Sequence, residues 1–139
     1  MSKNNENYFC WSDAWVFTAL YYSNKDKTKI NLSKLIAAGD VLNHAIFTKD
    51  EIKNAFIKLQ RTGIIIIYSE IIEFTDDGLK LMEKIEKVRG GLFSRIDISL
   101  QKLNSRRNKF PFFDDVNNCD FITDEMMDES YKIYKKYFM

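Results

Sequence analysis

Apolar residues recur at helical spacing in several separate stretches of the chain. The clearest stretch follows Thr48, where four of them stand at i, i+3, i+4 and i+7: Ile52, Ala55, Phe56 and Leu59. That spacing places them on one face of a helix. Thr48 and Glu51 stand three residues apart at its start and predict a capping box, in which each side chain bonds the other residue's amide. Gly63 predicts its end.

Two further helices are expected before this one. The first spans about residues 12–23, with Ser12 or Asp13 as its cap. Its predicted apolar stripe comprises Trp15, Ala19 and Tyr22, with Val16 and Leu20 beside it. The second helix opens at Asn31 or Ser33, and its apolar side is Leu32, Leu35, Ile36 and Leu42.

A β-hairpin is expected after the capped helix. Residues 64–68 are rich in β-branched side chains and too short for a helix, and residues 71–74 return the pattern. Ser69 and Glu70 between them form the predicted turn, although it lacks the usual glycine. The charged residues 24–29 are expected to form a loop.

Three helices are expected in the rest of the chain. Thr75 caps the first, and Asp76 and Asp77 suit the positive end of its dipole. The second covers 92–107, with Leu92, Ile96, Leu100 and Leu103 on its stripe. Thr123 begins the last, which carries Met127, Tyr131, Tyr134 and Phe138 on one side. These aromatic residues are expected either to pack against the helix at 12–23 or to form a dimer interface.

The order of these elements resembles the bacterial winged helix-turn-helix superfamily. The resemblance is carried by Thr48-x-x-Glu51, Leu59-x-x-x-Gly63-Ile64 and Phe74-Thr75-x-x-Gly78, with Leu79 and Leu81 behind. The stretch Ile36–Thr48 resembles, more narrowly, small bacterial winged-helix proteins of unassigned function.

The resemblance implies a mostly α (α+β) fold, a winged helix-turn-helix with one small β-hairpin followed by a C-terminal helical arm. The domain would cover residues 12–89 and the arm residues 90–139, after a frayed segment at 1–11. The helix after Thr48 takes the position of the recognition helix and the hairpin that of the wing. A DNA-binding, regulator-like function follows as an expectation, with a homodimer through the C-terminal helix.

The exposed face of the helix after Thr48 carries residue types that can contact DNA. Asn54, Lys58 and Arg61 are the candidates for base or groove contacts, since asparagine and arginine can read adenine and guanine. The candidates for phosphate contacts are Lys53, Arg106 and Arg107. The alternative interpretation of the same face is a solvated amphipathic surface.

Charge argues against DNA as a partner. The chain holds 21 basic and 20 acidic residues, and residues 49–90 hold eight of each. The wing tip carries Glu70, with Glu73 near it, and phosphates repel carboxylates. Residues 91–109 have a net charge of +4 and residues 110–139 of −4, so the two segments can also neutralise each other. The alternative function is therefore a winged-helix protein–protein interaction module without nucleic-acid binding.

Other chemistry has little support in the sequence. One histidine and two cysteines exclude a His-rich or Cys-rich metal site, and no catalytic motif is present, so we expect no metal, no cofactor and no enzyme. His44 is expected to cap or pack the turn after the second helix. The aspartates at 114–124 are expected to face solvent or pair with arginines. Reduced thiols and the absence of an export signal predict a cytoplasmic protein without a membrane span.

Overall fold

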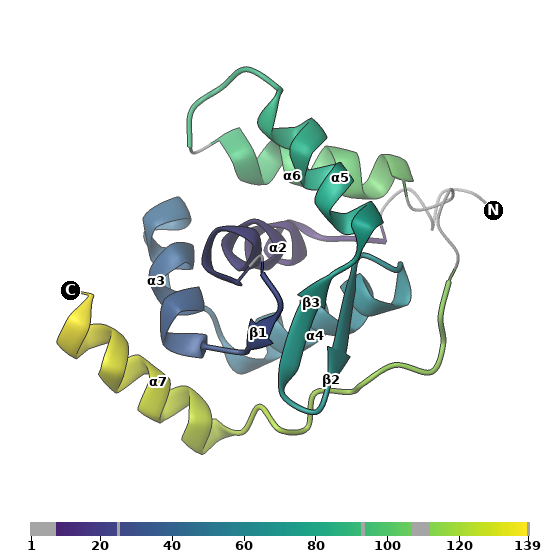
Figure 1. The fold of residues 1–139 in the computed structure, drawn as a ribbon. Coiled ribbons are helices and arrows are strands. Elements are labelled where there is room, and N and C mark those ends of the chain that lie inside the picture. Colours follow the sequence, from purple (N-terminus) through teal and green to yellow (C-terminus); the bar gives the residue numbers. More distant parts are fainter. Residues whose placement is uncertain (1–7, 25, 93, 107–111, 139) are drawn as a thin grey trace.

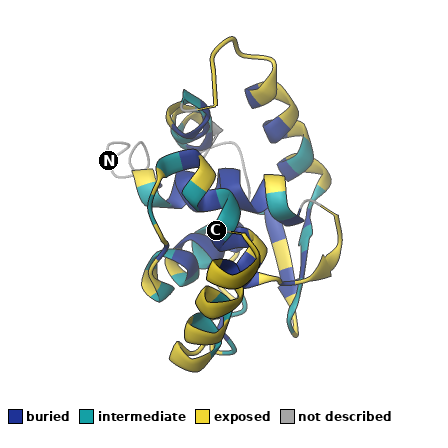
Figure 2. Cartoon of the chain, turned by 90° about the vertical axis from the view of Figure 1, so that its left-hand side faces the viewer, coloured by how far each residue is buried: buried dark blue, intermediate teal, exposed yellow. Residues whose placement is uncertain are grey.

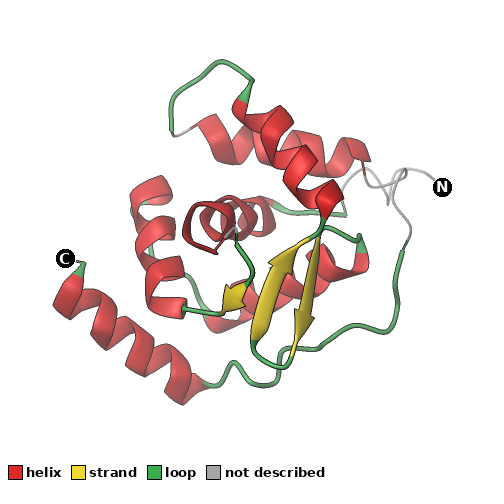
Figure 3. Cartoon of the chain, viewed as in Figure 1, coloured by secondary structure: helices red, strands yellow, loops and turns green. Residues whose placement is uncertain are grey.

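Helices make up most of the described chain, and a small sheet lies beside them (Figures 1 and 3). The computed structural model describes residues 8–24, 26–92, 94–106 and 112–138. Its elements in chain order are α2 (Trp11–Asn24), β1 (Thr28–Lys29), α3 (Leu32–Asn43), α4 (Lys49–Arg61), β2 (Ile65–Tyr68), β3 (Ile71–Phe74), α5 (Asp76–Glu86), α6 (Ser94–Arg106) and α7 (Asp124–Tyr137). The predicted fold class, mostly α (α+β) with one small hairpin and a C-terminal helical arm, is confirmed.

Local signals set where most helices begin. In the capping box of α4, the Glu51 amide donates to Thr48 Oγ1 at 3.1 Å and the Thr48 amide donates to Glu51 Oε1 at 2.8 Å. Thr75 and Thr123 cap α5 and α7 as predicted, and the side chain of each accepts a hydrogen bond from the amide three residues later. Asn31 caps α3, which decides between the two predicted starts. Each cap satisfies amides that the first turn of a helix leaves unpaired.

The start of α2 differs from the prediction. The helix begins at Trp11, one residue early, so Ser12 and Asp13 lie inside its first turn. Asp13 reaches back and accepts a hydrogen bond from the Cys10 amide at 2.8 Å. Asp13 therefore completes the helix start from within, as the third residue of a capping box does.

The sheet has three strands in the order β1-β3-β2, all antiparallel. The prediction of a loop over 24–29 is wrong at its end, because Thr28 and Lys29 pair with Ile72 and Ile71 on β3. The hairpin β2–β3 turns at Ser69, which adopts the left-handed conformation (φ 57°) in place of a glycine. The order leaves β2 as the outer strand on the side away from β1.

Helix α2 is buried on nearly every side rather than along one stripe. All residues from Asp13 to Tyr21 are buried, while Tyr22, predicted as part of the stripe, is exposed. Helices α3, α4 and α6 pack around α2, so the arm supplies one of its walls. Figure 2 shows buried positions concentrated on the central helices and α7 largely exposed.

The arm departs from prediction at its last helix. Helix α7 packs against α3, and it is α6 that packs against α2. Of the aromatic residues predicted on one side of α7, Tyr134 is buried, and Tyr131 and Phe138 are exposed. The Tyr134 hydroxyl donates a hydrogen bond to Asp40 of α3. This bond to a carboxylate, together with burial, raises the pKa of Tyr134 to about 12.

Tyr134 makes the docking of α7 sensitive to alkaline pH. Because the pKa is raised above its ordinary value of 10.0, the stabilisation is fully present below pH 10.0 and is lost as pH rises through about 12. We expect the free energy of unfolding to fall less steeply over this window in Tyr134→Phe than in the parent chain. Urea titrations at several pH values measure the free energy of unfolding of both proteins. An equal pH dependence in the two would contradict the role given to the Tyr134 hydroxyl.

Candidate functional site

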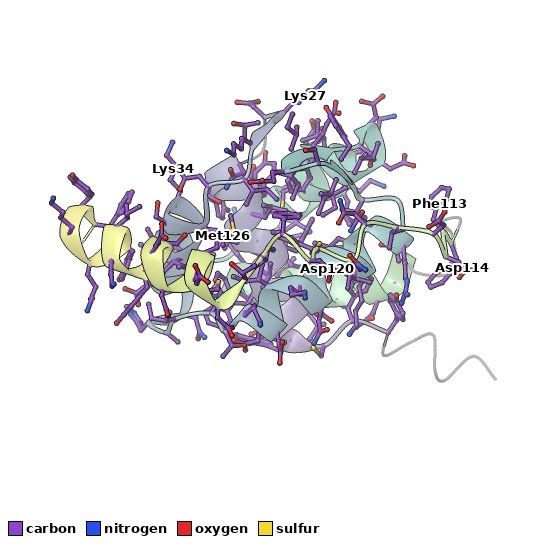
Figure 4. All side chains as sticks on the ribbon, turned by 90° about the horizontal axis from the view of Figure 1, so that it is seen from below. Lys27, Lys34, Phe113, Asp114, Asp120 and Met126 are labelled. Carbon is purple, nitrogen blue, oxygen red and sulfur yellow. The ribbon has the colours of Figure 1, made fainter. Side chains whose placement is uncertain are left out.

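A segment of the arm runs along α4 before entering α7. We call residues 112–123 the strap. Seen from below, it passes from Phe113 and Asp114 across the molecule to Asp120 and then to Met126 in α7 (Figure 4). The strap holds three aspartates and no basic residue. It therefore brings negative charge to the helix that the sequence predicts as the recognition helix.

Hydrogen bonds fix the strap to the end of α4. The Phe113 amide donates to the Arg61 carbonyl at 2.8 Å. The buried side chain of Gln60 binds both backbone groups of Asn117: its amide nitrogen donates to the carbonyl at 2.7 Å, and its oxygen accepts from the amide at 3.1 Å. Gln60 thus holds the strap as a neighbouring strand would.

Ion pairs and buried side chains continue the attachment. Lys53 pairs with Asp120 at 3.8 Å, and Lys49 pairs with Asp124 at 2.9 Å. Cys119 and Ile122, close to these aspartates in the chain, are buried. Burial raises the pKa of the Cys119 thiol to about 11, so the group is neutral and unreactive near pH 7. The strap is anchored by apolar burial, and the exposed ion pairs add less.

The opposite flank of α4 is occupied by the start of α2. The Lys58 ammonium lies 2.7 Å from Asp13 Oδ2, and Asp13 is only 1% exposed. The same ammonium lies over the Tyr8 ring, 5.6 Å from its centre. Lys58 is therefore held by a buried carboxylate on its own chain.

A narrow ridge of α4 remains between the two flanks. At 100° per residue it comprises Asp50, Asn54, Ile57 and Arg61. Asn54 is exposed, as the sequence predicts. Arg61 is half-buried, and its Nε bonds no partner within the described residues. The ridge offers one acid and one base.

The other candidate residues lie apart from this ridge. Arg106 ends α6, and its side chain lies outside the described residues, as does Arg107. Arg95, which the sequence counts in the basic segment 91–109, is buried and binds backbone carbonyls. The basic segment 91–109 and the acidic segment 110–139 do not simply neutralise each other, because Asp120 and Asp124 of the acidic segment pair with lysines of α4.

Two smaller expectations also have an outcome. His44 is the C-cap of α3 in the left-handed conformation, and it caps the helix through its backbone amide, which donates to the Asp40 carbonyl at 2.6 Å, rather than through its side chain as expected. The aspartates at 114–124 are exposed, and the two that form ion pairs bind lysine rather than arginine.

No group of three or more potential metal ligands occurs in the described part of the chain. Nor does any helix there combine the length and apolarity needed to cross a membrane.

The strap and the Asp13–Lys58 pair are the features that sequence reasoning missed. The signal for the strap was its three aspartates, 114, 115 and 120, close to the apolar residues Cys119 and Ile122, but spacing alone does not reveal its partner. Comparison with family models, curated proteins and solved structures finds no match for this chain. The geometry itself must therefore support any functional conclusion.

Replacing Gln60 with alanine should loosen the strap. The variant loses both hydrogen bonds to Asn117, which we expect to cost about 1–3 kcal/mol. Cys119 should then react with iodoacetamide several times faster, while exposed Cys10 reacts as before. Mass spectrometry of timed samples measures both sites. Asn54→Ala, also on α4, is the control, and equal Cys119 rates in all three proteins would contradict this prediction.

Proposed function

We propose that this chain is a winged-helix module that binds another protein and that, in the described conformation, it does not read DNA. The observation that carries the proposal is the pairing of Lys53 and Lys58 with carboxylates of the same chain. Non-specific DNA affinity depends on basic side chains that neutralise phosphates. Two of the candidates on α4 are thus already neutralised.

The combined width of α4 and the strap also argues against DNA binding. A helix with its side chains is about 10–12 Å across, and the major groove of B-DNA is about 12 Å wide. Helix α4 alone would fill the groove, and the strap along its flank adds the width of a second chain. Groove reading, the function expected from the resemblance, would require the strap to leave α4.

The charge of the hairpin also argues against DNA binding. Its turn carries Glu70, which lies 4.0 Å from Lys29 on β1, and Glu73 follows on β3. A wing that lies along phosphates benefits from basic side chains instead. The exposed apolar side chains nearby, Ile66 and Phe113, are each 49% exposed and favour a protein surface as partner.

A homodimer through α7 is a second candidate assembly. It is favoured by exposed apolar side chains on that helix, namely Tyr131, Ile133, Tyr137 and the following Phe138. Sedimentation of the parent chain and of the Tyr137→Asp variant distinguishes a monomer from a homodimer.

A cytoplasmic location and the absence of catalysis belong to the same proposal. The two free thiols are consistent with a reducing compartment.

Duplex DNA binding by the full chain tests the proposal directly. We expect no salt-sensitive change in fluorescence anisotropy with random-sequence duplex at about 50 mM or about 200 mM salt. The proposal would be overturned by micromolar DNA binding that is lost at the higher salt. That binding should also be lost in the double variant Asn54→Ala with Arg61→Ala. Pull-down should recover a stoichiometric protein partner that survives nuclease treatment.

Strap release provides the control for this experiment. The Gln60→Ala variant is expected to loosen the strap without changing the charge of α4. If only this variant bound DNA, the winged helix would be a DNA reader that the strap holds inactive, and the proposal would be wrong in its choice of partner.

A further inference from the structure

A groove lies between the outer strand of the hairpin and the strap. Its volume is about 470 Å³, and it is open to solvent. Strand β2 lines one side, and Phe113, Asp115, Val116 and Asn117 of the strap line the other, with the end of α4 and the start of α5 also contributing. Because the sheet order is β1-β3-β2, no described strand pairs with the outer edge of β2.

The register of the hairpin shows which backbone groups of β2 face this groove. Tyr68 pairs with Ile71 across the turn, and the Thr75 amide donates to the Ile64 carbonyl at 3.0 Å. Hydrogen-bonded pairs alternate along an antiparallel ladder. The amides and carbonyls of Ile65 and Ile67 therefore face away from β3, toward the groove.

These outward groups have no strand partner among the described residues. Ile65 and Ile67 are both buried, and among the described residues neither backbone bonds to the strap. Buried amides and carbonyls are almost always paired in folded proteins. An extended chain laid along β2 would pair them, as strand addition does at other sheet edges.

The side chains around the groove define the chemistry of that chain. Ile66, Val116 and Phe113 give it apolar walls. Asp77 at the start of α5 and Asp115 on the strap are exposed carboxylates, and none of the described residues that line the groove is basic. An occupant needs apolar side chains for the walls and positive charge for the two carboxylates.

We propose that this groove binds a short, extended, basic-apolar peptide segment of a partner protein as an added strand on β2. The four residues of β2 span about 13 Å, which a peptide of similar length would match. Side chains alternate between the two faces of a strand. A segment of alternating apolar and lysine or arginine residues thus presents one kind of side chain to each face. The inference rests on the proposed function and names the class of partner.

A capped peptide of alternating lysine and valine, about six residues long, is the probe. We expect it to bind the full chain with salt-sensitive anisotropy, while the glutamate–valine peptide does not bind. Amide exchange at Ile65 and Ile67, followed by NMR, should slow about tenfold on binding. Exchange at Ile66 and Tyr68, which already face β3, should change little.

Neutralising the two carboxylates tests the charge requirement. Asp77→Asn with Asp115→Asn should weaken binding about five- to tenfold. The matched control, Asp50→Asn with Asp128→Asn, makes the same charge change away from the groove and should bind as the parent chain does. Circular dichroism confirms that each variant is folded, and the exchange pattern of the parent chain stands independently of them.

Three results would overturn the inference: no binding of the lysine–valine peptide, binding without slower exchange at Ile65 and Ile67, or equal affinity in both paired variants. Its failure is distinguishable from that of the proposed function. DNA binding by the full chain overturns the function. A protein partner retained by Ile66→Lys overturns only the groove assignment.

Discussion

Asp13→Ala is expected to lower the free energy of unfolding by about 2–4 kcal/mol, because it breaks a buried ion pair and a helix start together. The substitution leaves the Lys58 ammonium without its carboxylate and the Cys10 amide without its acceptor. The Lys58 side chain is 28% exposed, so water recovers part of the loss. Urea unfolding at neutral pH measures the change.

A double-variant cycle separates the ion pair from the helix start. Asp13→Ala with Lys58→Ala should cost less than the two single variants added together, because each single variant leaves one charge unpaired. Asp50→Ala, which removes an exposed carboxylate from the first turn of α4, is the control for charge alone. Strict additivity of Asp13 and Lys58 would contradict the structural role of this pair.

Arg95→Met is expected to cost a similar amount, about 2–4 kcal/mol. Arg95 is only 6% exposed, and its guanidinium donates to the carbonyls of Ile85 at 2.7 Å and Val88 at 2.5 Å. Weaker bonds reach the carbonyls of Gly90 and Gly91. This single side chain satisfies the end of α5 and fixes the turn into α6.

The geometry of Arg95 also predicts the effect of lysine. An ammonium cannot reproduce a planar fork that serves several carbonyls, so Arg95→Lys should recover only part of the loss. Arg89→Met, an exposed arginine in the same connection, should leave the thermal midpoint nearly unchanged. A parent-like midpoint in Arg95→Lys would show that the carbonyl contacts contribute little.

The parts of the fold that the sequence predicts depend on neighbours within a few residues. Thr48 and Glu51 stand three positions apart, and Thr75 caps a helix through Gly78. The types of these residues therefore indicate directly where each helix begins. Strand β1 has no such signal, because Thr28 and Lys29 become a strand only where β3 offers its edge.

The environment of α2 shows a second limit of local patterns. From Ala14 to Leu20, Thr18 is the one polar residue, which is typical of a helix buried all round. The Thr18 hydroxyl fits because it donates to the Ala14 carbonyl at 2.7 Å and lies 2.9 Å from Ser99 Oγ on α6. That partner is 81 positions away, and no periodicity identifies it.

The candidate site was predicted in its residue types and not in its contacts. The helical wheel places Lys58 on the exposed face of α4 and Lys53 on its flank, whereas in the structure both side chains are half-buried. It cannot show that Asp120 and Asp13, far along the chain in both directions, reach those lysines. Whether a basic side chain is available to a ligand depends on such distant partners.

The central position of α2 has a consequence for how the protein is made. Its last residue, Asn24, leaves the ribosome seventy residues before Ser94, the first residue of the helix that completes its burial. At about 5–20 residues per second, the nascent chain carries a largely apolar helix for about 4–14 seconds before α6 is synthesised. The Phe9 amide then donates a hydrogen bond to Asn104 Oδ1 of α6 at 2.9 Å, which joins the first described segment to this later helix. Burial of α2 is therefore complete only after α6 has been synthesised, and until then the growing chain presents an apolar helix face that chaperones for apolar segments can bind.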